Sequence, residues 1–258
     1  HPPHAPAGPA FAVRAGREEE GLHITRAPQR YLSESAVFIS PREVLSIYPC
    51  YMQAGKRYPE LLDSASWELC SALEDEPGSA PLHGALRHVM QSIEKLLSGR
   101  LLRINGRFYL RRAGQEPLEL NLVAEGFKRI GTLGLLLGNG TVRPGTALFW
   151  DEPEMNLNTS HMPAIVGMMT GLCRAGIQLM ITTHSLFLLR ELVIQLAEPG
   201  NRHLTRRYIG LQPPANSREG VLCSSGDQLS DISPLESLDA ESEQADRYLS
   251  MGMDDRPY

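Results

Sequence analysis

The sequence predicts an α/β protein built on a parallel β-sheet, with a helical lobe and a β-ribbon insertion. Short apolar runs of strand length, such as the one ending at Asp151, alternate with longer amphipathic stretches of helix length. This order implies parallel strands joined by right-handed helical crossovers. The run ending at Asp151 has no polar alternation, so we expect it to be buried on both faces of the sheet. An Asn-Gly pair between two β-rich runs marks the ribbon.

Composition narrows the class of protein. A chain of 258 residues with 42% hydrophobic and 21% charged residues can bury a proper core. The net charge of −5 argues against an overall electrostatic footprint for nucleic acid. No apolar run reaches membrane-spanning length and no signal-peptide pattern opens the chain, which predicts no membrane association. The four cysteines form no Cys-x-x-Cys pair, so we expect a reduced, cytoplasmic protein without a zinc or disulfide framework.

Four regions are predicted along the chain. Residues 1–30 are rich in Pro and Ala and are expected to be poorly ordered, with an edge strand at Leu22–Ile24. Residues 31–122 form the helical lobe and the β-hairpin, residues 123–212 the regular α/β half, and residues 213–258 an acidic tail. The elements expected in the lobe are a buried strand at 36–39, two helices between Glu43 and Leu73 broken near Pro49 and Pro59, and a helix at 82–97 closed by Gly99.

The predicted ribbon spans 101–110, with a third strand at 118–122. Five arginines with no acid between them lie along it: Arg100, Arg103, Arg107, Arg111 and Arg112. The favoured interpretation is a solvated face, and the alternative is contact with nucleic acid or a partner.

Helices and strands alternate regularly along the predicted α/β half, and the tail that follows is polar. The predicted elements of this half are a helix at 125–138, the strand ending at Asp151, a helix at 159–175, a strand at 177–183 and a helix at 186–196 capped by Ser185. The tail carries an excess of acids and one predicted helix near 235–249.

Two adjacent carboxylates, Asp151 and Glu152, close the central apolar strand. The carboxyl ends of parallel strands are where α/β proteins bind ligands. There, an aspartate can hold hydrated Mg²⁺ and a glutamate can deprotonate the water that attacks a γ-phosphate. The alternative is an acidic pair that begins a solvated turn.

Three stretches in register resemble the second half of an ABC-type ATPase domain, in the SMC-like branch of the AAA family ATPases that includes DNA-repair and anti-phage proteins. They are Ala124-Glu125-Gly126 at a helix start, Asp151-Glu152, and Thr182-Thr183-His184-Ser185 at the end of the next strand. The resemblance covers about residues 31–212 and implies a P-loop NTPase-type core, with ATP and Mg²⁺ as cofactors.

The resemblance also implies a role for each matched residue. It places Mg²⁺ on Asp151, makes Glu152 the general base and makes His184 the switch histidine that bonds the γ-phosphate. The remaining matches are the signature motif Ala124, Glu125 and Gly126, directed at nucleotide held by a second protomer, and the D-loop positions Asn156 and Asn158, which cross the dimer interface.

Two departures from the family pattern stand out. Ala124 occupies the place of a serine whose hydroxyl reaches the phosphate. No Gly-x-x-x-x-Gly-Lys-Ser/Thr motif occurs, and the only Gly-Lys pair, Gly55-Lys56, has Cys50 and Arg57 where that motif needs Gly and Ser/Thr. We therefore expect an incomplete ATPase core whose P-loop segment lies N-terminal to residue 1.

The leading hypothesis is an ATP-binding and ATP-hydrolysing protein of the DNA-repair or phage-defence type. ATP would close a dimer, with a second copy or a different partner, and the ATPase would act on DNA or on an effector protein. The alternative is a non-hydrolysing regulatory or scaffold subunit on the same fold. A metal-dependent nuclease using Asp151, Glu152 and His184 is disfavoured, because the sequence offers no further carboxylate cluster.

Overall fold

The structure is a computed structural model that describes residues 12–15, 22–26, 35–58, 63–76, 78, 81–212, 221–232 and 236–252. The chain divides into two units, His1–Ser35 and Ala36–Tyr258. In the first unit, β1 (Ala12–Ala15) pairs antiparallel with β2 (Leu22–Arg26). The strand predicted at Leu22–Ile24 is therefore confirmed. The poor order predicted for the rest of 1–30 concerns positions outside the described residues.

A three-stranded parallel sheet forms the centre of the second unit, as predicted. Its strands are β3 (Ala36–Ile39), β7 (Ala147–Asp151) and β8 (Gln178–Thr182), in the order β3-β7-β8. The chain leaves β7 through a helix and returns as β8, so both strands end at the same edge of the sheet. Asp151 pairs with Thr182 in the last rung of this ladder.

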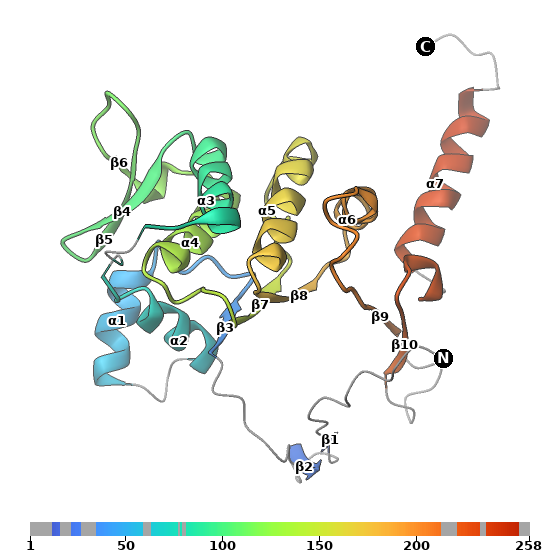
Figure 1. The fold of residues 1–258 in the computed structure, drawn as a ribbon, viewed down its shortest axis with the longest axis horizontal. Helices are drawn as coiled ribbons and strands as arrows, with labels where there is room; N and C mark the ends of the chain where they lie inside the picture. The colour runs from blue at the N-terminus through green and yellow to red at the C-terminus, as the bar shows by residue number, and fades with distance from the viewer. Residues whose placement is uncertain are drawn as a thin grey trace. The chain divides into compact units, whose positions relative to one another are not determined.

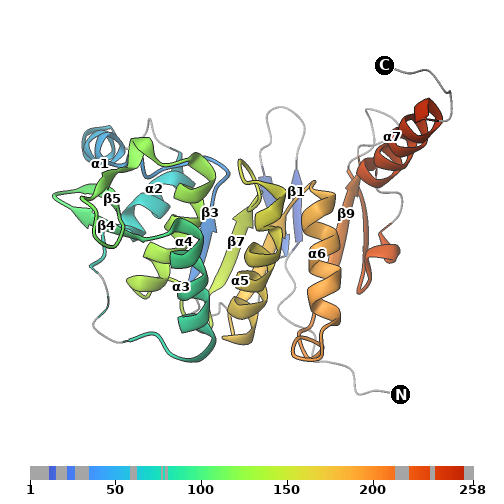
Figure 2. The same cartoon turned by 90° about the horizontal axis from the view of Figure 1, so that it is seen from above.

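One face of this sheet is buried against a layer of helices. Figures 1 and 2 show α3, α5 and α6 side by side along the sheet, and α4 packs against α3. Their bounds are α3 (Gly84–Leu97), α4 (Glu125–Gly138), α5 (Met162–Arg174) and α6 (Leu186–Ala197). Alternate strand residues point into this layer, and Ile39, Leu148 and Trp150 are at most 2% exposed. Apolar burial on this face is the main source of the fold's stability.

The opposite face of the sheet is partly exposed. Phe38, Phe149 and Met180 stand in one row across the three strands and are 40%, 37% and 42% exposed. The prediction that the strand ending at Asp151 is buried on both faces is therefore wrong, because Phe149 meets solvent. Within the part of the chain that is described, no strand pairs with the outer edge of β8.

The helical lobe consists of α1 (Tyr48–Arg57) and α2 (Ser64–Ala72). Pro49 lies in the first turn of α1, where a missing N–H costs little, so this proline begins a helix instead of breaking one. Asp63 caps α2 by accepting a hydrogen bond from the Ser66 N–H at 2.8 Å. Gly55 allows the two helices to meet, because a Cβ there would lie 1.9 Å from the Trp67 ring.

The ribbon contains β4 (Arg100–Ile104), β5 (Arg107–Arg111) and a short β6 (Leu118–Glu119). The predicted turn is confirmed, since Asn105 and Gly106 both adopt positive φ. The third strand is shorter than predicted, because residues Leu120–Leu122 turn into a 3₁₀ helix that buries Leu120.

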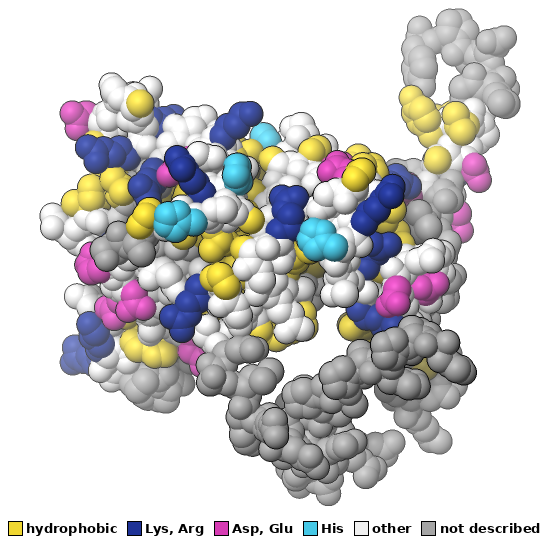
Figure 3. Space-filling view, in the orientation of Figure 1, with side chains coloured by type: hydrophobic (Ala, Val, Ile, Leu, Met, Phe, Trp, Pro, Cys, Tyr) yellow, Lys and Arg dark blue, Asp and Glu magenta, His cyan; other side chains and the backbone are white. Residues whose placement is uncertain are grey.

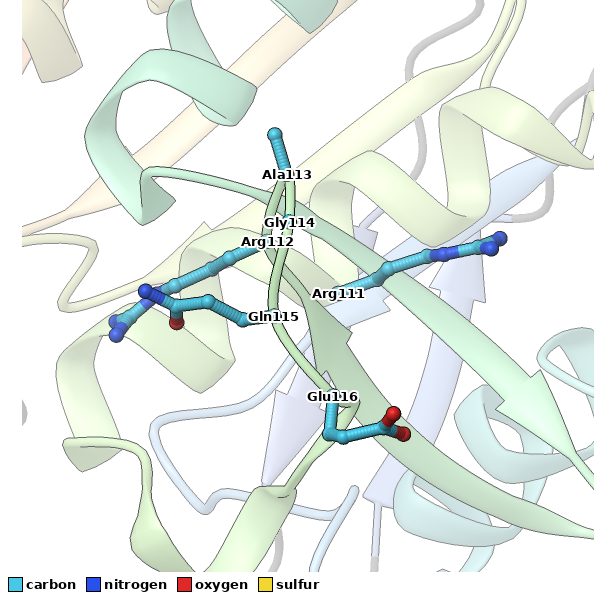
Figure 4. A pocket seen from close by; sticks show the side chains of 6 residues that line it. All are labelled: Arg111, Arg112, Ala113, Gly114, Gln115 and Glu116. Atoms are coloured by element: carbon cyan, nitrogen blue, oxygen red, sulfur yellow. The ribbon is translucent and has the colours of Figure 1, made fainter.

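The five ribbon arginines do not form one basic surface. Arg103 donates hydrogen bonds to Tyr48 Oη and to the Glu74 carbonyl, while Arg100 pairs with Glu94 at 3.5 Å. Arg111 and Arg112 point to opposite sides of the strand (Figure 4). Lys and Arg side chains are likewise scattered over the face in Figure 3. This distribution favours the solvated-face interpretation.

The C-terminal part contains two strands that the sequence did not predict, β9 (Tyr208–Gln212) and β10 (Leu222–Gly226), paired antiparallel. A 3₁₀ turn, η4 (Leu229–Asp231), and the helix α7 (Glu236–Gly252) follow, so the helix predicted near 235–249 is confirmed. Arg190 on α6 binds Glu241 on α7 through both carboxylate oxygens. Among the described helices, none combines the length and the apolar character that a membrane span requires.

Candidate functional site

Two carboxylates and a histidine meet where β7 and β8 end. Asp151 is the last residue of β7, and one of its carboxylate oxygens accepts a hydrogen bond from the Thr182 hydroxyl. The Glu152 N–H donates to the Thr182 carbonyl at 3.1 Å, which extends the ladder by one bond. The parallel register thus fixes the Asp151 carboxylate at the sheet edge beside the segment that carries His184.

Glu152 turns its side chain toward His184. It adopts a φ of 47°, a left-handed conformation that is uncommon for glutamate and is typical of tight turns at functional sites. Its Oε1 lies 2.8 Å from His184 Nδ1. An ionised carboxylate only accepts, so Nδ1 carries the proton in this contact. The hydrogen bond to Glu152 raises the pKa of His184, which favours the imidazolium form.

A third carboxylate, Glu154, supports the same site and was not predicted from the sequence. It accepts a hydrogen bond from the Thr183 hydroxyl, whose oxygen in turn accepts from the Ser185 N–H at 3.0 Å. Burial raises the pKa of Glu154. One donor atom each from Glu152, Glu154 and His184 falls within 4.8 Å of the others. The signal in the sequence was the second Glu of the Asp151-to-Glu154 stretch, together with the two threonines before His184.

Arg129 contacts the end of β7 beside the two acids, and this role was not predicted from the sequence. It is 2% exposed, and its guanidinium donates to the Asp151 carbonyl at 2.6 Å and to the Met155 carbonyl at 3.4 Å. Burial lowers the pKa of Arg129, and the charges of nearby acids, Glu154 first, oppose that shift. The arginine therefore ties α4 to the end of β7 from the inside.

The predicted signature and D-loop positions touch each other. Ala124 is the N-cap of α4 and offers no side-chain cap, and Glu125 begins the helix. A Cβ at Gly126 would lie 2.5 Å from the Asn156 carbonyl oxygen, so glycine is required for this close approach. Asn156 adopts a φ of 62°, as expected in a tight turn. The α4 N-terminus is consequently packed on the turn that follows the two acids.

Asn158 has a local role in addition to its predicted one. Its side chain accepts a hydrogen bond from the Ser160 N–H at 2.9 Å and caps the short helix η3 (Thr159–His161). The Phe127 ring of α4 lies 5.6 Å from the His161 ring, measured between centroids, so α4 and the start of α5 are in contact.

The oxygen atoms of this site suit a magnesium ion, but the site lacks part of what a nucleotide needs. Mg²⁺ prefers oxygen ligands and is usually bound by one or two carboxylates together with water and substrate phosphates. Asp151 offers such a carboxylate beside the Thr182 hydroxyl, and Glu152 Oε2 is buried with no hydrogen-bond partner among the described residues. However, the sequence contains no glycine-rich loop that could cradle the β- and γ-phosphates. A surface pocket lined by residues Arg111–Glu116 lies on the ribbon (Figure 4) and contains none of the site residues at the ends of β7 and β8.

Comparison with known proteins identifies the family. No curated protein matches the chain. The SMC head domain from Thermotoga maritima is similar over 72% of this chain and 68% of its own, with 14% identity and a TM-score of 0.33, a level that carries no functional inference. The model of the family described as "AAA domain, putative AbiEii toxin, Type IV TA system" matches residues 51–190, just over half of the chain. The chain therefore belongs to this AAA-domain family, a family of P-loop ATPases.

Proposed function

We propose that this chain supplies the magnesium-binding and water-activating half of an ATP-hydrolysing site. The observation that supports the proposal best is the contact between Glu152 and His184 at the ends of two adjacent parallel strands, directly beside Asp151. A carboxylate–imidazole pair next to a metal-binding carboxylate is suited to activating water against a phosphoryl group.

Each residue has a separate task in the proposed reaction. Asp151 holds Mg²⁺, which neutralises charge on the phosphates when bound. Glu152 orients the attacking water and accepts its proton. His184 uses Nδ1 to bond Glu152, which leaves Nε2 as the ring nitrogen available to the γ-phosphate. The raised pKa of His184 favours the cationic form, the better partner for an anionic phosphate.

The partly exposed face of the sheet, and the edge of β8 that no described strand pairs with, fit a phosphate-binding segment supplied by other residues. Sheets made only of parallel strands are normally covered on both faces. A parallel strand added beside β8 would end next to His184, and a helix following it would cover Phe38, Phe149 and Met180. The loop between them would meet the γ-phosphate site from the third side. Such a strand–loop–helix unit could come from a longer chain or from a partner.

We further propose that the ATPase works as a dimer, with a second copy or another subunit. The N-terminus of α4 at Ala124–Gly126 would face nucleotide held by the partner, where its free N–H groups and helix dipole favour an anion. The turn at Asn156 and Asn158 contacts this helix end and would lie in the same interface. DNA or an effector protein, in a DNA-repair or phage-defence setting, remains the proposed target of the ATPase.

A fluorescent ATP analogue, titrated with and without Mg²⁺, tests the proposal. We expect Asp151→Asn to weaken the Mg²⁺-dependent part of binding at least tenfold. Glu152→Gln should leave binding within about threefold and abolish hydrolysis, since it removes the base and keeps the shape. Glu68→Gln, which removes an exposed carboxylate of α2, is the matched control and should change neither quantity.

The same titration separates the alternative function. A regulatory or scaffold subunit on this fold would show no saturable binding at millimolar nucleotide. Its binding to partner proteins would be unchanged in Asp151→Asn. That result, obtained with the phosphate-binding segment present, would refute an ATPase. If the protein binds nucleotide but shows no hydrolysis that is lost in Glu152→Gln, the assignment of Glu152 as the general base is refuted.

A further inference from the structure

We propose that Glu154 and Thr183 form a clamp, named here the Glu154–Thr183 clamp, that positions His184 against Glu152. The inference rests on the proposed function in assigning His184 to the γ-phosphate, but its geometry is independent of nucleotide. Glu154 and Thr183 are positioning residues, since they would act on the reaction only through the imidazole.

The clamp holds the chain on both sides of His184. The Thr183 hydroxyl donates to Glu154 Oε1, while the Thr183 oxygen accepts the Ser185 N–H at 3.0 Å. The residues immediately before and after the histidine are thereby tied to one carboxylate. Ser185 also caps α6 by accepting the Leu188 N–H at 3.4 Å, so the clamp reaches a rigid helix.

His184 needs such support because its own side chain is poorly held. The imidazole is 81% exposed, and its ring makes one hydrogen bond, to Glu152, among the contacts of the described residues. An exposed side chain that is free to rotate loses rotamer entropy when it is fixed in one geometry. Fixing the backbone at Thr183 and Ser185 reduces the number of orientations that the His184 ring can adopt.

In the clamp, Glu154 acts mainly through its hydrogen bond with Thr183 rather than through its charge. The charged groups that act on the imidazole are Glu152 and Glu154, both in the turn after β7, and the hydrogen bond to Glu152 dominates. Charge on Glu154 is the smallest of the contributions that raise the pKa of His184. The Glu154 carboxylate is half-buried, and the hydrogen bond from Thr183 opposes the rise in its pKa that burial causes.

An NMR titration of the His184 ring without nucleotide tests the clamp. The resonance is assigned by its loss in His184→Asn. In the parent protein, we expect the pKa of His184 to lie above its ordinary value. Thr183→Val removes the hydroxyl and no charge, so we expect most of this elevation to be lost. Thr183→Ser restores the hydroxyl and should restore the elevation.

Three further variants separate positioning from loss of structure. Thr170→Val removes a hydroxyl that bonds the Gly167 carbonyl within α5, and it should leave the His184 titration unchanged. Glu154→Ala should lower the pKa of His184, and adding Thr183→Val to it should lower it no further, as expected for two members of one interaction. Amide spectra of each variant verify that it is folded.

An unchanged His184 titration in a folded Thr183→Val variant would overturn the clamp. Additive effects of Glu154→Ala and Thr183→Val would overturn it as well, because they would show independent routes to the ring. Since the readout uses no ATP, a failed clamp leaves the proposed ATPase untouched, and a failed nucleotide titration leaves the clamp untouched.

Discussion

Replacement of Arg129 by methionine should destabilise the fold strongly. Methionine is likewise unbranched and of similar size, so little volume is lost at a site that is 2% exposed. It removes the donor of the 2.6 Å hydrogen bond to the Asp151 carbonyl, a bond from a charged group that contributes about 1.5–3 kcal/mol. The 3.4 Å contact with the Met155 carbonyl is long and adds less. Together, the loss of these two contacts should cost about 2–4 kcal/mol.

Urea unfolding followed by tryptophan fluorescence measures this cost. Trp150 is a suitable probe, because it is 1% exposed and precedes Asp151 in β7. The matched control is Arg190→Met, which breaks the ion pair with Glu241 at a side chain that is 52% exposed. Exposed pairs contribute at most about 1 kcal/mol. A free energy of unfolding for Arg129→Met within 0.5 kcal/mol of the parent, a threshold of about the size of ordinary surface effects, would refute the role given to the buried guanidinium.

Three further outcomes follow from the site and the core. Glu152→Gly should be more stable than Glu152→Ala by about 1 kcal/mol, because only glycine adopts the φ of 47° without strain; equal unfolding midpoints would contradict this. The pKa of Glu154 is raised above 4.5, so its contribution to stability is greatest below that pH and is lost as pH rises through the folded value. Unfolding midpoints measured across pH should therefore vary less in Glu154→Gln than in the parent protein. An unaltered pH profile would contradict this prediction. Burial raises the pKa of Cys70 to about 12, so thiol reagents should label the exposed Cys50 and Cys223 rapidly and Cys70 only on unfolding.

The parallel strands and the position of the site could be predicted because they depend on local patterns. Uninterrupted apolar runs predicted β7 and β8, and the polar residues after each run had to meet at one sheet edge. Asn105-Gly106 determined the hairpin turn through its backbone preference alone. In each case the necessary information lay within a few consecutive residues.

The supporting residues could not be predicted, because their roles arise from tertiary packing. Nothing in the helix pattern marks Arg129 as buried, since only the approach of the turn after β7 supplies its carbonyl partners. The exposure of Phe149 is a similar case, because an apolar strand looks the same whether one face or both are covered. The strands β9 and β10 were not predicted either, and each is stabilised by its antiparallel pairing with the other.

The partly exposed row of Phe38, Phe149 and Met180 has a practical consequence for handling the isolated chain. Apolar patches and unpaired strand edges are common starting points for precipitation and for sheet-to-sheet adhesion between copies. We expect light scattering of the purified chain to grow with concentration, and a serine in place of Phe149 to delay it. Co-production with whatever naturally sits on that surface should improve the yield of monodisperse material.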